Sequence, residues 1–356
     1  MKKIRIFLGA YINSTNAQNL NCLALARHLD KEKFDVYALE LYSGNLDNPP
    51  IYGVKTFRCF YPHKISKYLG YLWGIYHCDV AYLPKGEVDL WNHFWLKRLG
   101  KKSFNTVEGI LDSLAIESAG GEKVAVNRYK AFEKLYSITN FMRTYNQQKY
   151  SIASEEKILY LGTDIDTFLN ETKQASQLKH IVLIGNDLIR KGISDYLTLA
   201  HCFPMLTFHI VGTGNGQIDV TQEIRKRNLE NIVYHGGLTH ASLVELLKTI
   251  DLHLFPSRSE GFPKVTLETA AAGVPSLVYS DYGASEWITH RHDGFVVDTI
   301  DQMQEIIDEL IHSPALLQTT SRNAIELAKR FDWKVLIKDW EHIIEKLAEE
   351  GLLDEE

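Results

Sequence analysis

Short apolar runs recur along most of this chain, and segments with helical periodicity separate them. In the C-terminal half the runs return about every 20–25 residues, the spacing of strands that alternate with crossover helices. Such strands form parallel sheets with helices on both faces, so the chain predicts an α/β fold with two doubly wound sheets. The predicted strands are Ile4–Leu8, Phe34–Leu39, Val54–Phe57, Asp79–Leu83, Lys102–Val107, Leu135–Thr139 and Ile158–Leu161, then Ile181–Ile184, Thr207–Val211, Ile232–Tyr234, Ile250–Phe255, Ser276–Tyr279 and Phe295–Val297.

The length and composition indicate two domains. At 356 residues with 45% hydrophobic side chains, the chain is long enough to bury two cores. The polar, weakly periodic segment Asp166–Lys179 marks the linker between them. We therefore place the N-terminal domain at residues 1–168, the C-terminal domain at residues 169–332, and a terminal helix with an acidic tail at residues 333–356.

Charge and apolar content give expectations about partners and location. No apolar run reaches the roughly 18 residues of a membrane span, so we expect a cytoplasmic protein. Residues 1–164 carry 22 Lys plus Arg against 16 Asp plus Glu, and the remainder carries 17 against 29. The basic first half indicates either an ordinary solvated face, or peripheral contact with a phosphate-bearing acceptor or the inner membrane face. No basic motif of the nucleic-acid-binding kind is present, and the scattered cysteines indicate neither disulfides nor zinc.

One stretch joins an apolar strand to a helix and holds two acids. The strand Ile250–Phe255 is followed by Pro-Ser-Arg-Ser-Glu-Gly-Phe-Pro, and Pro263 predicts a helix start because proline suits the first helical position. The turn holds Glu260 and Gly261, and glycine lets the main chain approach a ligand closely. Backbone N–H groups at a helix N-terminus lack intrahelical partners, so this junction is suited to a phosphate or an anionic sugar.

The two acids, Glu260 and Glu268, are expected on the order of 10 Å apart, from the loop span and the helical rise. The carboxylates of a hydrolytic pair lie about 5 Å apart in retaining enzymes and roughly 6.5–9.5 Å apart in inverting ones. The wider spacing expected here favours contacts with two ends of a polyhydroxylated ligand. A sugar at one end and a ribose at the other would suit the carboxylates. The alternative is a helix N-terminal acid together with a surface acid.

The ordered string Pro-Ser-x-x-Glu-Gly-Phe-Pro-x-x-x-Leu-Glu-x-x-Ala-x-Gly-x-Pro resembles the signature of retaining glycosyltransferase family 4. The resemblance implies the GT-B fold, in which two Rossmann-like domains face each other across a cleft and a C-terminal helix crosses back to the first domain. It implies that Glu260 contacts the donor sugar and Glu268 the nucleotide ribose. The adjoining Gly261, Phe262 and Pro263 would then line the donor site.

A basic turn between two glycines, Gly185 to Gly192, places Arg190 and Lys191 at the start of a helix, where two cations suit a diphosphate. The alternative is a solvated basic turn. The segment resembles the family's phosphate motif, with Lys191 on the family lysine. The family arginine is replaced by Asn186, and we hypothesise that Arg190 compensates for it.

Two glycine-rich strand ends follow. Val211-Gly-Thr-Gly-Asn-Gly has the wrong spacing for a dinucleotide fingerprint, so we read Gly214 as part of a tight turn that borders the donor. By resemblance Gly236, Gly237 and Leu238 line the base pocket.

The first domain departs from the family pattern in two places. Asn16 and Ala17 stand where the family has a Gly-Gly pair beneath the donor phosphates, and Glu108 stands where it has a histidine that approaches the donor sugar. Glu108 is therefore either a ligand for a sugar hydroxyl or amine, or a strand-end acid in water.

Two predicted helices, His63–Tyr76 and Asp89–Leu99, are rich in aromatic residues. They indicate either an acceptor or membrane-facing surface, or core packing against the sheet.

The resemblance implies a retaining, metal-independent transferase that moves a hexosyl-type sugar from a nucleotide diphosphate to a hydroxyl of a saccharide or lipid-linked acceptor, in surface polysaccharide or glycolipid synthesis. A UDP-sugar is favoured over a GDP-sugar, and no cofactor is expected. Asp164-Ile-Asp166 lies in a structural turn and the histidines lack ligand spacing, so no metal is assigned. The alternatives are a nucleotide-sugar epimerase and a non-catalytic nucleotide-sugar-binding or scaffold protein of the same fold.

Overall fold

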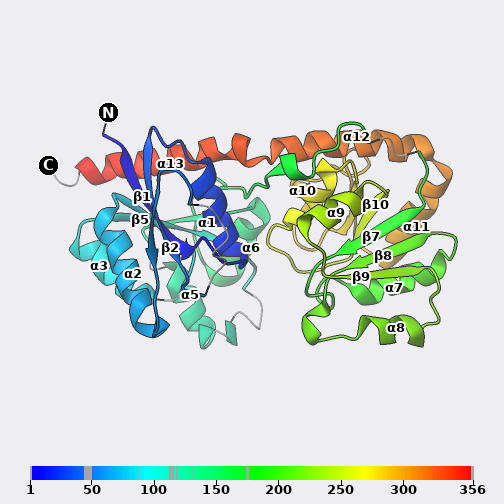
Figure 1. Ribbon diagram of the computed structural model, residues 1–356, viewed down its shortest axis with the longest axis horizontal. Coiled ribbons are helices and arrows are strands. Elements are labelled where there is room, and N and C mark those ends of the chain that lie inside the picture. The colour runs from blue at the N-terminus through cyan, green and yellow to red at the C-terminus, as the bar shows by residue number, and fades with distance from the viewer. Residues whose placement is uncertain are drawn as a thin grey trace. The chain divides into compact units, whose positions relative to one another are not determined.

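The computed structural model describes residues 2–43, 50–86, 88–111, 116–117, 119–130, 132–173 and 176–353, and the side chains of these except 352 and 353. The chain forms two compact units, Met1–Leu161 with Trp333–Glu356 and Gly162–Asp332. They are called unit 1 and unit 2 below. The α/β prediction is confirmed, because each unit holds one doubly wound sheet (Figure 1).

The sheet of unit 1 is parallel and six-stranded, in the order β3-β2-β1-β4-β5-β6. Its strands are β1 (Ile4–Tyr11), β2 (Phe34–Glu40), β3 (Val54–Arg58), β4 (Val80–Tyr82), β5 (Lys102–Val107) and β6 (Lys134–Ser137). The helices described in this unit are α1 (Ala17–His28), α2 (His63–His77), α3 (Asp89–Arg98), α5 (Glu122–Lys130), α6 (Asn140–Tyr150) and α13 (Trp333–Leu353). Gly74 of α2 lies directly on Phe7 of β1, since a Cβ there would be 2.2 Å from the ring.

The sheet of unit 2 repeats this topology, in the order β12-β11-β10-β7-β8-β9. Its strands are β7 (His180–Ile184), β8 (Thr207–Val211), β9 (Ile232–Gly236), β10 (Leu252–Phe255), β11 (Ser276–Tyr279) and β12 (Phe295–Val297). Its helices are α7 (Ile193–Cys202), α8 (Val220–Lys226), α9 (His240–Leu247), α10 (Lys264–Ala271), α11 (Ile300–His312) and α12 (Pro314–Arg330), with short 3₁₀ turns at Ile165–Thr167, Gly214–Gly216 and Ala284–Glu286. The strand order reverses between β10 and β7. Ligands of such sheets bind beside the carboxyl ends of the strands at this point.

The C-terminal helix packs in unit 1, as the resemblance implied. Trp340 of α13 is fully buried, and its ring lies 5.3 Å from that of Tyr82 and 6.3 Å from that of Phe104. Its indole Nε1 donates to the carbonyl of Tyr160 at 3.2 Å. These contacts explain why residues after Trp333 leave the core of unit 2.

The first boundary lies seven residues earlier than residue 169, the start predicted for the second domain. Ile165 and Phe168 are buried in the core of unit 2, so the chain enters that unit at Gly162. The predicted linker Asp166–Lys179 also belongs to unit 2, although its residues 174 and 175 lie outside the described residues. Lys173 fixes it there, because its ammonium donates to the carbonyls of Lys248 at 2.7 Å and Ile250 at 2.8 Å.

One strand prediction is wrong. The apolar run Ile158–Leu161 is not a strand, because it forms no ladder; Leu159 donates one backbone hydrogen bond to the carbonyl of Ser137 at 3.1 Å. The helix predicted to start near Pro263 is α10, which begins one residue later at Lys264, with Pro263 as its N-cap residue at a ψ of 94°. No helix in the described part of the chain has the length and apolar character needed to cross a membrane.

Candidate functional site

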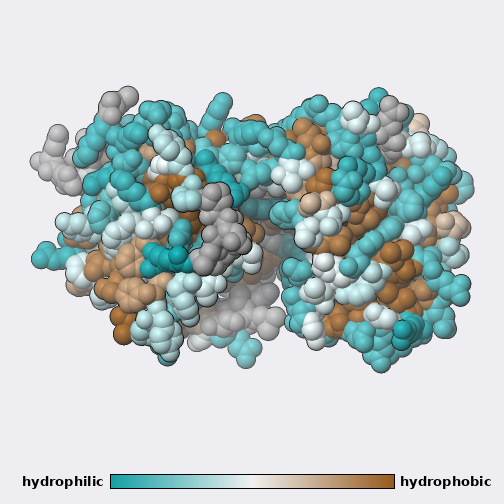
Figure 2. All heavy atoms as spheres, in the orientation of Figure 1, coloured by the Kyte–Doolittle hydropathy of each residue, from teal (hydrophilic) through white to brown (hydrophobic). Residues whose placement is uncertain are grey.

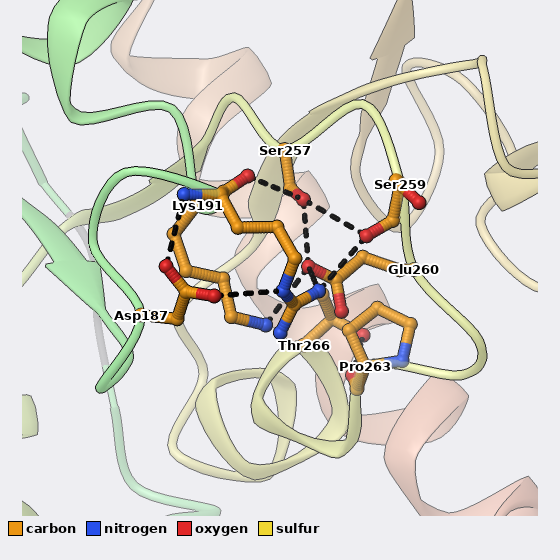
Figure 3. Close-up of polar contacts among 8 residues, drawn as sticks. Asp187, Lys191, Ser257, Ser259, Glu260, Pro263 and Thr266 are labelled. Atoms are coloured by element: carbon orange, nitrogen blue, oxygen red, sulfur yellow. Dashed lines mark hydrogen bonds and ion pairs between the residues drawn. The ribbon is translucent and has the colours of Figure 1, made fainter. Parts of the chain in front are cut away.

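Glu260 lies in the turn between β10 and α10, and its carboxylate is held on one side only. Its Oε1 accepts hydrogen bonds from the Ser257 hydroxyl at 2.6 Å, from Arg190 Nη1 at 2.8 Å and from the Lys191 ammonium at 2.9 Å. The side chain is 7% exposed, and no donor in the described part of the chain reaches Oε2 (Figure 3). The turn therefore orients the carboxylate and leaves one of its oxygens for a ligand.

Close backbone packing brings the two loops of this cluster together. Gly192 has a φ of +81°, and a Cβ there would lie 2.0 Å from the carbonyl oxygen of Pro256. A Cβ at Gly185 would lie 2.8 Å from Cγ of Lys191. The lysine Nζ in turn lies 4.7 Å from the centre of the Phe255 ring. Glycine is thus required at 192 for the loop after β7 to lie against the loop after β10.

Arg190 and Lys191 differ in how they are held. The Asp187 carboxylate accepts hydrogen bonds from the backbone N–H of Arg190 at 3.2 Å and from its Nε at 3.4 Å. Arg190 Nη1 also donates to the carbonyl of Ser259 at 2.9 Å. The arginine is 43% exposed and its Nη2 has no acceptor among the described residues. Lys191 is 12% exposed; burial lowers its pKa, and the charge of Glu260 opposes that shift. Both cations keep N–H donors for a further anion.

Glu268 lies on α10, and its main-chain carbonyl accepts from the N–H of Ala272 at 3.3 Å. Its side chain makes no hydrogen bond or ion pair within the described part of the chain and is partly buried. Burial raises its pKa, and the nearby His240 and Lys264 oppose this shift. A carboxylate in this state is suited to accept hydrogen bonds from ligand hydroxyls, because such donors would replace its lost hydration.

The remaining predicted donor-site residues of unit 2 lie at the carboxyl ends of β7, β8 and β9. Asn186 is exposed, and Gly214 is buried in the short turn after β8 with a φ of +68°. Gly236 has a φ of +65° with open space where a Cβ would point, Gly237 follows it, and Leu238 packs against the core of unit 2. The turn interpretation of Gly214 is therefore confirmed.

The predicted residues of unit 1 occupy a different environment. Asn16 caps α1, accepting from the N–H of Gln18 at 3.0 Å, and Ala17 is the first residue of that helix. Glu108 follows β5 and is bound to three side chains. Its oxygens accept from Asn21 Nδ2 at 2.9 Å, the Tyr82 hydroxyl at 2.9 Å and the Thr106 hydroxyl at 3.1 Å. The interpretation of Glu108 as a strand-end acid in water is thus wrong.

The aromatic helices α2 and α3 pack one face on the core of unit 1 and leave apolar side chains exposed on the other. Tyr71 is buried, and Trp73, Trp91 and Trp95 pack against the core of unit 1. Tyr68, Tyr76 and Phe94 are exposed, with Ile65, Leu69 and Leu90. Figure 2 shows brown atoms gathered where Figure 1 places α2 and α3. The core explanation therefore covers one face of these helices only.

Sequence reasoning missed the residues that position the cluster. Ser257 donates the shortest of the three hydrogen bonds to Glu260, and Asp187 holds Arg190. Both lie inside the predicted motifs, each three residues from the residue that it holds, so proximity in sequence was the available signal. Within the described residues, no group of three or more His, Cys, Asp or Glu side chains has the arrangement of a metal site.

The chain holds two doubly wound parallel sheets, and Glu260 lies with Arg190 and Lys191 beyond the carboxyl ends of β7 and β10. This arrangement is that of a two-domain α/β protein of the GT-B class. Sucrose-phosphate synthase of Thermosynechococcus elongatus shares this fold, with a TM-score of 0.76, 16% identity, and coverage of 98% of this chain and 99% of that one. HepE of Anabaena in complex with UDP has a TM-score of 0.75 at 17% identity, covering 97% and 100%. The predicted GT-B fold is confirmed.

Residues 164–327 match the family described as glycosyl transferases group 1. Alpha-galactosylglucosyldiacylglycerol synthase of Streptococcus pneumoniae is 26% identical over 226 residues, 62% of this chain and 57% of that protein. An uncharacterized glycosyltransferase of Methanocaldococcus jannaschii is 22% identical over 219 residues, 61% of this chain and 60% of that protein. The chain thus matches less than two thirds of the length of each of these two relatives.

Proposed function

We propose that this chain is a retaining, metal-independent glycosyltransferase. It moves a hexosyl-type sugar from a nucleotide diphosphate to a hydroxyl of a saccharide or lipid-linked acceptor. The observation that carries the proposal is the half-satisfied carboxylate of Glu260, fixed by Arg190, Lys191 and Ser257. The match of residues 164–327 to glycosyl transferases group 1 supports it.

In the proposed complex Oε2 of Glu260 accepts a hydroxyl of the donor sugar, and the unpartnered Glu268 accepts the ribose hydroxyls. The free N–H groups of Arg190 Nη2 and Lys191 hold the diphosphate. Cations preorganised in a partly buried site stabilise the charge that grows on a leaving diphosphate, which is commonly a large electrostatic contribution to catalysis. Because these cations are already oriented by Asp187 and Glu260, little reorganisation accompanies the reaction.

The reaction breaks the bond between the anomeric carbon and the diphosphate oxygen and forms a bond to the acceptor oxygen. The acceptor approaches from the face that the diphosphate leaves, so the configuration is retained. The proton of the acceptor hydroxyl passes to the departing diphosphate, and no protein nucleophile is required. Lys191 and Arg190 supply the positive charge for the leaving group.

A UDP-sugar is the favoured donor. The complexes of HepE with UDP and with UDP-glucose support this choice. The proposed setting is surface polysaccharide or glycolipid synthesis on the inner membrane face, and the name of the pneumococcal relative, alpha-galactosylglucosyldiacylglycerol synthase, supports the glycolipid part of it.

The test is thermal stabilisation of the protein by UDP, GDP and ADP and by their sugar conjugates, with and without EDTA, followed by transfer assays with the stabilising conjugate. A ligand at about one hundred times its dissociation constant contributes roughly 2.7 kcal/mol. We expect stabilisation by the uridine series and unchanged transfer in EDTA. Failure of every nucleotide to stabilise the protein would overturn the proposal.

A second candidate is a nucleotide-sugar-binding protein without transfer activity. The observation that favours it is Glu108, whose oxygens are occupied by Asn21, Tyr82 and Thr106 at the position of the family's histidine. Stabilisation by a UDP-sugar, with neither transfer nor hydrolysis across a broad set of acceptors, would support this candidate.

A further inference from the structure

Two cavities of unit 1 share a wall made by Gly86, Asp89 and Arg128. The smaller cavity, about 170 Å³, has polar groups from Gln18, Asn105 and Tyr129 on its lining. Asn105 is on β5, and Gln18 is in the first turn of α1, so this cavity adjoins the carboxyl end of the sheet. Neither cavity contains any residue of the Glu260 cluster.

The larger cavity is about 500 Å³ and is mainly apolar. Tyr68, Val88, Leu90, Trp91 and Val124 line it. Leu90 is 89% exposed, an unusual state for a leucine beside a cavity of this size. The Trp91 indole is fixed by its hydrogen bond to the carbonyl of Tyr68 at 3.1 Å. The apolar walls are therefore open to an incoming molecule.

Asp89 stands between the two cavities without a hydrogen-bond donor. Both of its carboxylate oxygens are buried and have no donor among the described residues. Its one charged neighbour there is Arg128, whose Nε lies 3.8 Å from Oδ2. Burial raises the pKa of Asp89. A buried carboxylate in this state is costly unless a bound molecule donates to it.

The neighbouring charges restrict what that molecule is. The guanidinium of Arg128 disfavours an ammonium group beside Asp89, and Asp89 disfavours an anion. A neutral hydroxyl donates to the carboxylate without either conflict. Exposed aromatic and aliphatic walls on the other side suit an apolar chain or ring.

We propose that the two cavities form one binding site for a small amphipathic alcohol. Its hydroxyl-bearing end, of sugar or polyol type, lies in the smaller cavity and donates to Asp89. Its apolar part fills the larger cavity between Trp91, Leu90 and Val124. Resting on the proposed function, this molecule is the acceptor of the transfer, which makes Asp89 an acceptor-binding residue.

The test uses octyl glucoside below its micelle concentration as the probe, with glucose and octyl sulfate for comparison, and titration calorimetry on the full chain. We expect saturable binding of octyl glucoside, at least tenfold tighter than either comparison probe. Asp89→Leu removes the carboxylate oxygens that accept the hydrogen bond from the probe. Val124→Trp fills the larger cavity from an exposed position. Each variant should weaken octyl glucoside at least tenfold.

Phe94→Ser is the matched control. Phe94 is 60% exposed on the same helix and does not line either cavity. This variant should bind the probe as wild type does. If Phe94→Ser abolishes binding, or if octyl sulfate binds equally well, the probe merely adsorbs to the apolar surface and the proposal is overturned. Unchanged binding to both cavity variants also overturns it.

UDP stabilisation separates this inference from the proposed function. Asp89→Leu and Val124→Trp should keep the wild-type response to UDP, which also shows that they fold. Loss of probe binding with an intact UDP response supports the site. If the wild-type protein binds octyl glucoside but no nucleotide, the binding site is supported and its role as the acceptor site of a transfer is rejected.

Discussion

The ammonium of Lys191 donates to Glu260 Oε1 at 2.9 Å, although 69 residues separate the two in sequence. Arg190 donates to the same oxygen at 2.8 Å. The proposed phosphate-binding cations and the proposed sugar-binding acid are therefore one electrostatic unit before any ligand arrives. Each partner keeps groups for a ligand, since Oε2 of Glu260 and Nη2 of Arg190 have no partner in the described residues.

The shared ion pair predicts strong energetic coupling. Lys191→Met and Glu260→Gln should each lower the thermal midpoint of unfolding by about 6–12 °C, the effect of roughly 3 kcal/mol on a domain of this size. Glu260→Gln leaves the mostly buried Lys191 uncompensated, and Lys191→Met leaves the mostly buried Glu260 with the more exposed Arg190 alone. The double variant should lose much less than both shifts together. Lys248→Met, which removes an exposed pair with Glu245, is the control. Additive shifts in the double variant would contradict the coupling.

Substitutions at Arg190 and Asp187 should separate a direct contact with the diphosphate from the positioning of Arg190. Arg190→Gln removes a charge that contacts the diphosphate in the proposed complex, so kcat should fall about 100-fold. Asp187→Asn leaves Arg190 in place but loosens it, so a smaller fall, about tenfold, is expected with the same donor specificity. Arg291→Gln, from an exposed pair with Glu309, should keep wild-type kinetics. Equal losses from Asp187→Asn and Arg190→Gln would mean that Asp187 contributes more than orientation.

The sequence predicted those parts of the fold that depend on local periodicity. Twelve of the predicted strands correspond to strands of the structure, because buried parallel strands appear as apolar runs. Ile158–Leu161 is the exception, since an apolar run that packs into the core has the same appearance without a ladder. The boundary at Gly162 could not be predicted from local periodicity, because it depends on the tertiary packing of Phe168 in the core of unit 2.

The candidate site was predictable to the level of its charged residues. Glu260, Arg190 and Lys191 came from motif positions, and the structure brings them together. The cavity beside Asp89 had no local signal, because it needs residues of α3 and α5 that are distant in sequence. An aspartate in the first turn of a helix is ordinary by sequence, and only its missing donors make it notable.

Glu268 should show opposite effects on stability and on binding. Without ligand, Glu268→Gln should raise the thermal midpoint, because burial of an unpartnered carboxylate is unfavourable and a neutral amide avoids that cost. UDP affinity should fall about 10–100-fold through loss of charge-assisted hydrogen bonds to the ribose. The measurements are thermal melts and calorimetric titration with UDP. A variant that melts lower and binds UDP normally would show that Glu268 has a structural role alone.

Acid should destabilise unit 2 through a row of histidines. His209 Nε2 lies 3.1 Å from His180 Nδ1, and His209 Nδ1 lies 3.0 Å from His235 Nε2. Burial, reinforced by His235 and His180, lowers the pKa of His209 from 6.5 to about 4. Between these pH values the unfolded chain binds a proton at His209 and the folded chain does not, so stability is lost as the pH falls from 6.5 toward 4.

The measurement is the thermal midpoint of unfolding between pH 7.5 and pH 4. His209→Gln keeps a hydrogen-bonding side chain that does not titrate, so its midpoint should fall less steeply over this range. Part of the slope should remain, because burial also lowers the pKa of His253, to about 3. His312→Gln, on an exposed side chain of α11, should follow the wild-type curve. Parallel curves for wild type and His209→Gln would place the acid sensitivity elsewhere in the chain.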